Sequence, residues 1–281
     1  MQQAREAARR MTCANNVRQL SLAILNYESG YRVLPPGWDT HGTLWTAAIL
    51  PQIEQGDLYS TLIFDETRGN WDVTTSPNYR ALQQVIPTFR CPSGIELSPR
   101  DYNGIARRVP CSYKCNTGND ATADNHSDRF IVGTKSFETV ELNGVMYGCS
   151  KTKLASISDG LANTVLIGEA RTNPAFSKDG NATDFWAIGA PQVDPCDCKG
   201  GTAGAEFSEA GGSFHPEVNI QRLRPSVSGH YMVVAFGSHH IGGVTMGKAD
   251  GSTTFVSETV DIKVSRAVGS RGGREQVDFA D

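Results

Sequence analysis

The chain has 281 residues, of which 39% are hydrophobic and 20% are charged. These proportions are typical of a globular protein with a large core and exclude a disordered chain. The formal net charge is −4 and no basic block occurs, which argues against nucleic acid as a partner because phosphate binding needs a positive surface. No apolar run in this sequence approaches the roughly 18–20 residues of a membrane span.

The first element is a predicted helix over residues 1–29, with Gly30 as its C-cap. Its apolar residues recur at intervals of four and three and form one stripe, made of Cys13, Val17, Leu20, Ile24 and Tyr27. Toward the N-terminus, the same face of the helix carries Arg10 and then Glu6, so residues 2–10 offer no apolar face to a core. The pattern indicates either a stalk that enters a domain or an ordinary first helix with a frayed start.

The middle of the chain is predicted to contain short helices and two long insertions. Residues 43–63 are expected to form two short helices broken at Pro51, and Tyr79–Ile86 a third, followed by a short strand at Phe89–Pro92. Residues 93–150 and 171–230 are polar and irregular, so we interpret both as insertions.

The C-terminal part is richer in β-structure. Thr164–Ala170 is a predicted strand, and residues 231–258 form a β-hairpin region in which Asp250-Gly251 suits a tight type I′ turn. Ile262–Ala267 is a predicted last helical turn. One long helix, short helices and then an antiparallel sheet make an α+β fold class.

Several segments resemble a known family. His240, nine residues and then Asp250-Gly251 resemble the H-x9-DG signature of a planctomycete-type pilin-like family, the domain of unknown function 1559, which has a type II secretion pseudopilin-like character. Further segments continue the resemblance along nearly the whole chain. They are residues 3–20, Leu34–Gly37, Leu50–Gln55, Cys91–Ser93, Ile157–Thr164, Gly168-Glu169 and residues 267–275.

The resemblance implies a single pilin-like domain over residues 1–281, with a long N-terminal helix packed on an antiparallel sheet. It also implies an apolar helix before residue 2 that anchors the chain in the membrane, and a periplasmic or cell-surface location in the cell envelope. We expect the stripe to face the sheet and residues 2–10 to touch almost nothing. The expected partners are other pilin-like subunits or secretion-system components.

Three functions follow as hypotheses. The first is a non-enzymatic pilin or pseudopilin-like subunit that is anchored or assembled through its helix. The alternative is a surface module that binds a ligand or polysaccharide through its insertions. A metal-dependent hydrolase built around His240 ranks third, because no nucleophile elbow, Walker loop or dinucleotide fingerprint occurs in this sequence.

Two groups of polar residues are candidate metal sites. His240 with Asp250 would be a metal or catalytic pair, whereas the simpler interpretation gives Asp250-Gly251 to the turn; the neighbouring His239 points to the other face of a strand. Asp159, Asn163 and Glu169 carry oxygens suited to calcium, the one cofactor considered, although a capped turn explains the first two. Further acidic residues, spaced by four in a loop, are expected to be solvated: Asp120, Asp124 and Asp128.

Seven cysteines are many for a cytosolic chain of this length. Cys13 lies on the helix stripe and is predicted to be a buried free thiol. The others are candidates for three disulfides whose pairing the spacing leaves open: Cys91, Cys111, Cys115, Cys149, Cys196 and Cys198. A zinc site made of Cys111, Cys115, Cys196 and Cys198 is the less favoured alternative, because its spacings match structural zinc sites poorly.

Overall fold

A computed structural model describes ten stretches of the chain. They are residues 2–40, 43–64, 73–94, 98–102, 105–123, 133–137, 141–171, 184–187, 210–223 and 233–273. The helices, including short 3-10 turns labelled η, are α1 (Gln2–Tyr31), α2 (Trp45–Ala48), η1 (Leu50–Ile53), α3 (Gly56–Thr61), α5 (Pro77–Ala81), η2 (Pro87–Phe89), η4 (Leu154–Ser156), α6 (Ile220–Leu223) and α8 (Ile262–Ala267). The strands are β1 (Arg100–Tyr102), β2 (Ile105–Arg108), β3 (Tyr113–Gly118), β4 (Ala121–Ala123), β5 (Lys135–Ser136), β6 (Val165–Glu169), β7 (Gly211–Ser213), β8 (Gly243–Lys248) and β9 (Thr253–Ser257).

Within the described residues, the main sheet has five strands in the order β7-β3-β6-β8-β9. The pairs β3–β6, β6–β8 and β8–β9 are antiparallel, and only the edge strand β7 runs parallel to its neighbour. Together with the long first helix, this sheet confirms the predicted α+β class.

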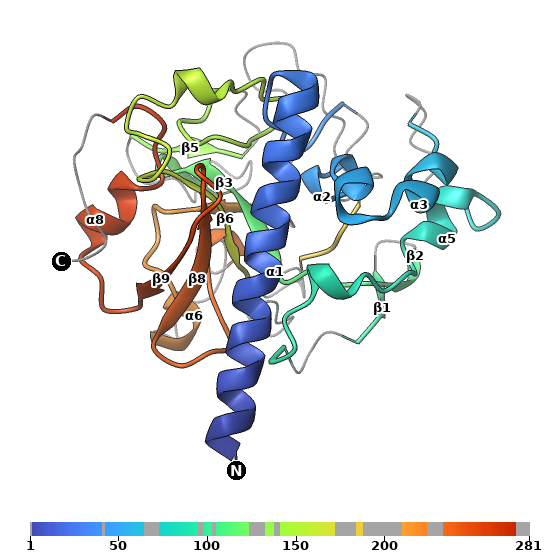
Figure 1. Cartoon of the computed structure of the whole chain (residues 1–281), viewed down its shortest axis with the longest axis horizontal. Coiled ribbons are helices and arrows are strands. Elements are labelled where there is room, and N and C mark those ends of the chain that lie inside the picture. Colours follow the sequence, from blue (N-terminus) through green and yellow to red (C-terminus); the bar gives the residue numbers. More distant parts are fainter. Residues whose placement is uncertain are drawn as a thin grey trace.

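Helix α1 packs along the sheet and continues well beyond it. It contacts β6, β8 and β9 on one side and η1 and η2 on the other, while its N-terminal turns project past the rest of the molecule (Figure 1). The predicted stripe is confirmed, since its first four residues are completely buried and Tyr27 is half-buried against the same core. Gly30 is not the C-cap: the helix ends at Tyr31, and Arg32 follows in the left-handed conformation.

The close approach of α1 to β8 depends on a residue without a side chain. A Cβ added at Gly247 would overlap Ser21 Oγ on the helix. We therefore expect Gly247→Ala to lower the free energy of unfolding by about 2 kcal/mol, the usual cost of overpacking a core. Gly30→Ala is the matched control, because a Cβ there meets open space and alanine favours the helix. Urea denaturation measures both variants, and equal stability of the two would contradict this packing.

The interpretation of residues 93–150 as an insertion is wrong, because β3 lies inside the main sheet. Every residue of β3 is buried although the strand reads as polar. Its polar side chains have partners: Asn116 donates to the carbonyls of Val165 and Gly269, Thr117 donates to Gly212, and Lys114 pairs with Asp184 at 3.3 Å. Likewise β7 belongs to the sheet, so residues 171–230 are not wholly an insertion.

Two predictions of local secondary structure are wrong. Pro51 does not break residues 43–63 into two helices but sits in the first turn of η1, where a missing N–H costs nothing. The third helix is only α5, and Phe89 ends the 3-10 turn η2 rather than starting a strand.

The C-terminal hairpin forms as predicted, but its turn differs. Gly251 N–H bonds Lys248 O, and the loop holds Ala249, Asp250 and Gly251, with Gly251 alone at positive φ (+82°). This is a type I turn followed by a left-handed glycine, the usual three-residue hairpin, rather than a two-residue type I′ turn. Helix α8 begins and ends as predicted, capped by Asp261. Of the predicted hairpin region, residues 231–232 lie outside the described residues, and Ala235 makes only an isolated bridge to Ser213.

Candidate functional site

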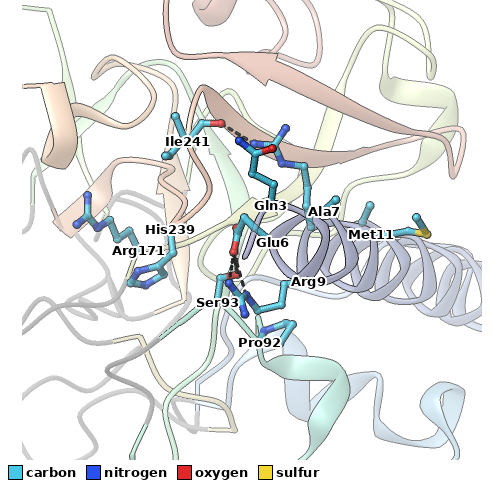
Figure 2. A pocket seen from close by; sticks show the side chains of 12 residues that line it. Gln3, Glu6, Ala7, Arg9, Met11, Pro92, Ser93, Arg171, His239 and Ile241 are labelled. Carbon is cyan, nitrogen blue, oxygen red and sulfur yellow. Dashed lines mark hydrogen bonds and ion pairs between the residues drawn. The ribbon is translucent and has the colours of Figure 1, made fainter. Parts of the chain in front are cut away.

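An open pocket lies where α1 leaves the body of the protein. It has a volume of about 1230 Å³ and is lined by α1, the Pro92-Ser93 segment and the segment around His239 (Figure 2). Glu6 forms part of its wall together with the basic side chains of Arg9, Arg10 and Arg171. Glu6 accepts from Arg9 at 2.9 Å, and Arg10 donates to the carbonyl of Ile241 at 2.6 Å.

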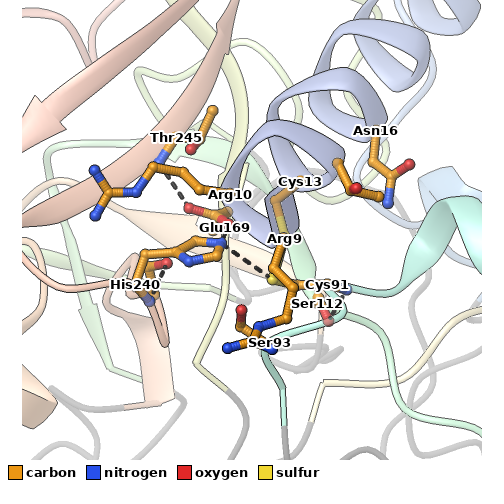
Figure 3. Close-up of polar contacts among 12 residues, drawn as sticks. Arg9, Arg10, Cys13, Asn16, Cys91, Ser93, Ser112, Glu169, His240 and Thr245 are labelled. Atoms are coloured by element: carbon orange, nitrogen blue, oxygen red, sulfur yellow. Dashed lines mark hydrogen bonds and ion pairs between the residues drawn. A yellow bond between two sulfur atoms is a disulfide. The ribbon is translucent and has the colours of Figure 1, made fainter. Parts of the chain in front are cut away.

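Beneath this pocket, a disulfide joins α1 to the segment after η2. It links Cys13 to Cys91 across 78 residues of sequence (Figure 3). The prediction that Cys13 is a free thiol is therefore wrong, because the first buried residue of the stripe meets Cys91 rather than the apolar core alone. The bond fixes α1 at the point where its face changes from exposed to buried.

The other cysteines fall into three groups. Cys149 is also disulfide-bonded, as predicted. Cys111 and Cys115 form no disulfide and stay as completely buried thiols; burial raises the pKa of Cys111 to about 12 and raises that of Cys115 as well. Thiols held protonated in this way are poor nucleophiles. Cys196 and Cys198 lie outside the described residues, as does half of the alternative zinc site.

His240 is completely buried and lies at the centre of a group of five residues that we call the cluster: Glu6, Cys13, Cys91, Glu169 and His240. Its Nδ1 lies 2.6 Å from Glu6 Oε1 on α1, and its Nε2 lies 3.4 Å from Cys91 Sγ and 3.5 Å from Glu169 Oε1 at the end of β6. The imidazole thus connects the helix, the disulfide and the sheet.

The two carboxylates beside His240 have opposite electrostatic environments. Burial raises the pKa of Glu169, although the hydrogen bond that its Oε2 accepts from the Thr245 N–H at 2.7 Å acts in the opposite direction. The other oxygen, Oε1, makes no hydrogen bond. For Glu6, slight burial acts to raise the pKa, but hydrogen bonds from His240 and Arg9 outweigh it and the pKa is lowered. Glu6 therefore stays ionised while Glu169 retains its proton more readily.

The expectation that residues 2–10 touch almost nothing is wrong for one side of the helix. Gln3, Ala4, Arg5, Ala7 and Ala8 are exposed, as expected. Glu6, in contrast, reaches His240 and Ser93, and the Arg10 guanidinium lies 4.9 Å from the centre of the Phe255 ring. We call residues 2–10 the collar of α1. One face of the collar is held against the domain, and the other is exposed.

His240 and Asp250 do not form a pair. They lie at opposite ends of β8, which at about 3.3 Å per residue separates them by roughly 20 Å. Asp250 accepts from the backbone and hydroxyl of Ser252 and so belongs to the turn. His239 does not join the cluster either but faces the pocket.

The candidate calcium residues are likewise not brought together. Asp159 accepts from Ser270 and from the Gly273 N–H, and Asn163 donates to the Asp159 carbonyl, so both belong to a capped turn. Glu169 lies at the other end of β6. Of the acidic loop, Asp120 pairs with Lys135 at 3.4 Å, while Asp124 and Asp128 lie outside the described residues.

His239 should make stability depend on pH. Burial, and then the nearby Arg171 and His240, lower the pKa of His239 from 6.5 to about 4. As the pH falls below 6.5, the His239 imidazole binds a proton in the unfolded chain but stays neutral in the folded chain until about pH 4. The free energy of unfolding therefore falls between pH 6.5 and about 4, by at most about 3 kcal/mol. Urea denaturation across this range should show a smaller loss for His239→Gln, and parallel curves would contradict the assignment.

The chain matches, over residues 2–263, the family described as a protein of unknown function (DUF1559). It belongs to this family. The match confirms the family predicted from the sequence. No curated protein and no solved structure matches the chain. In this DUF1559 protein, no helix of the described residues is both long and apolar enough to span a membrane.

Segments on which the DUF1559 resemblance rests converge on the cluster. The collar supplies Glu6, the next turn of α1 supplies Cys13, and Cys91, Glu169 and His240 come from three further segments. Glu6 was not among the predicted site residues. The sequence feature that could have identified it is its position seven residues before Cys13, which places the Glu6 carboxylate on the same face of the helix as the buried stripe.

Proposed function

We propose that this protein is a non-enzymatic, pilin-like component of the cell envelope, anchored or assembled through α1 in a type II secretion or type IV pilus-like machinery. The observation that carries the proposal is that the two halves of α1 lie in different surroundings. Its second half packs along an antiparallel sheet, and its first half is a polar helix that projects beyond the domain (Figure 1). A helix that continued into lipid from Gln2 would present this collar at the membrane surface.

The cluster supports this proposal mechanically. A domain held through one helix must pass any load on that helix into its sheet. The Cys13–Cys91 disulfide attaches α1 to the segment after η2, just beyond the collar. His240 connects Glu6 in the collar to Glu169 at the end of β6 in the sheet. Arg5 on the exposed face, together with Arg9 and Arg10, would suit anionic lipid headgroups. The partners we propose are pilin-like subunits or secretion-system components.

Membrane fractionation tests anchoring. We expect the product of the native gene, detected with an antibody against this domain, to remain in the membrane pellet after carbonate extraction. Protease added to spheroplasts should digest the domain, because it lies on the periplasmic or outer side. A carbonate-soluble product that is protected in spheroplasts would contradict the proposal.

The second candidate is a surface ligand-binding module, and the pocket of Figure 2 favours it. Its volume suits a small ligand, and its basic side chains favour an acidic one. A screen of acidic sugars by titration calorimetry would decide. Binding that is lost in Arg9→Ala would support this candidate, and no binding would remove it.

A further inference from the structure

Four side chains at the cluster offer donor atoms that lie within 4.8 Å of one another: Cys13, Cys91, Glu169 and His240. All four are buried, and they come from α1, β6 and two loops. In the structure the two sulfurs are bonded to each other. We propose that reduction of the Cys13–Cys91 disulfide converts this cluster into a tetrahedral zinc site with these four residues as ligands.

The donor set and its spacing match zinc. Zinc takes thiolate, imidazole and carboxylate ligands in a tetrahedron, with Zn–S of about 2.3 Å and Zn–N of about 2.0 Å, which sets neighbouring donor atoms about 3.3–3.8 Å apart. His240 Nε2 already lies 3.4 Å from Cys91 Sγ and 3.5 Å from Glu169 Oε1. The two sulfurs must separate from a bonded distance to about 3.8 Å. Every other pair of donor atoms already lies within 4.8 Å, so it needs only a small adjustment to reach tetrahedral spacing.

The surroundings of the donors are those of a metal site. Glu6 lies 2.6 Å from His240 Nδ1, where it holds the proton on that nitrogen and leaves the Nε2 lone pair directed at the cluster. Glu169 Oε2 is occupied by the Thr245 N–H, whereas Oε1 is buried and makes no hydrogen bond. A buried carboxylate oxygen without a hydrogen bond is costly, and a metal ion would satisfy it.

The chemistry requires a dithiol as reductant. The dithiol gives two electrons and two protons to the disulfide, forming two cysteine thiols, and is itself oxidised to a disulfide. Zinc binding then releases the two thiol protons to solvent. The bound ion with two thiolates and one carboxylate carries a net charge of −1. The pocket, whose wall includes Glu6 and Pro92, gives the reductant a route toward the cluster.

The proposal is tested on the purified chain, oxidised and after anaerobic treatment with dithiothreitol followed by desalting. We expect equilibrium dialysis against zinc to load about one additional ion per chain in the reduced sample only. Cobalt in place of zinc should give the visible bands of a tetrahedral site and a thiolate charge-transfer band. Zinc should also raise the melting temperature of the reduced chain.

Variants separate this site from other thiols. His240→Ala and Glu169→Gln should each weaken zinc binding at least about tenfold, whereas His239→Ala and Cys149→Ser should bind as the wild type. Circular dichroism checks that each variant is folded, and the cobalt spectrum of the wild type provides evidence independent of the variants. No additional zinc in the reduced chain, binding unchanged in both ligand variants, or a disulfide that is reduced only on unfolding would each overturn the proposal.

Discussion

Cys13→Ser should lower the free energy of unfolding by about 4 kcal/mol under oxidising conditions. The disulfide links residues 78 positions apart, and a crosslink that closes a loop of this length removes a large entropy from the unfolded chain. It also attaches α1 to the segment after η2, so its loss frees the helix at the start of its buried half. Urea denaturation measures the effect.

The control for this prediction is the same comparison made in the presence of a reductant. In reductant, the wild type has already lost the crosslink, so wild type and Cys13→Ser should unfold at nearly the same urea concentration. A difference that persists in reductant would mean that the serine acts through packing, and no difference in oxidant would mean that the crosslink does not stabilise the fold.

His240→Ala should cost about 3 kcal/mol at neutral pH. Removing the imidazole leaves Glu169 buried beside a cavity and removes the partner of Glu6, and stranded buried polar groups are among the most destabilising consequences of a single substitution. Hydrogen exchange should also accelerate in the collar, which loses its contact with the domain.

His239→Ala is the matched control for this prediction. The two histidines are adjacent, but His239 faces the pocket and makes none of the cluster contacts. We expect its loss to cost less than about 1 kcal/mol at neutral pH and to leave exchange in the collar unchanged. Similar losses for the two variants would show that His240 does not connect α1 to the sheet.

Patterns that repeat along one element predicted the structure well. The stripe of α1, the strand β6, the hairpin of β8 and β9, and α8 all follow from side-chain periodicity and local turn chemistry, which act over a few residues. The family and the α+β class follow from the same segments. These elements can be predicted without knowing which other segments of the chain pack against them.

Features that depend on distant partners could not be predicted. Strand β3 has a polar sequence but is buried, because the side chains of Asn116, Thr117 and Lys114 find partners up to about 150 residues away. A sequence pattern does not show such partners. The pairing of Cys13 with Cys91 and the meeting of Glu6 with His240 across 234 residues are tertiary facts of the same kind. The proposed zinc site becomes visible only when these partners are known.

We propose that the exposed face of the collar and the adjoining turn of α1 hold the domain in the envelope. Photo-cross-linking in living cells tests it most directly, with a photoreactive amino acid at Met11, which is 65% exposed on α1. Val85, a 49% exposed apolar residue between α5 and η2, is the matched control. We expect adducts in the membrane fraction, to a second copy or another envelope protein, from Met11 and not from Val85. Equal adducts from both positions, or none from Met11, would contradict it.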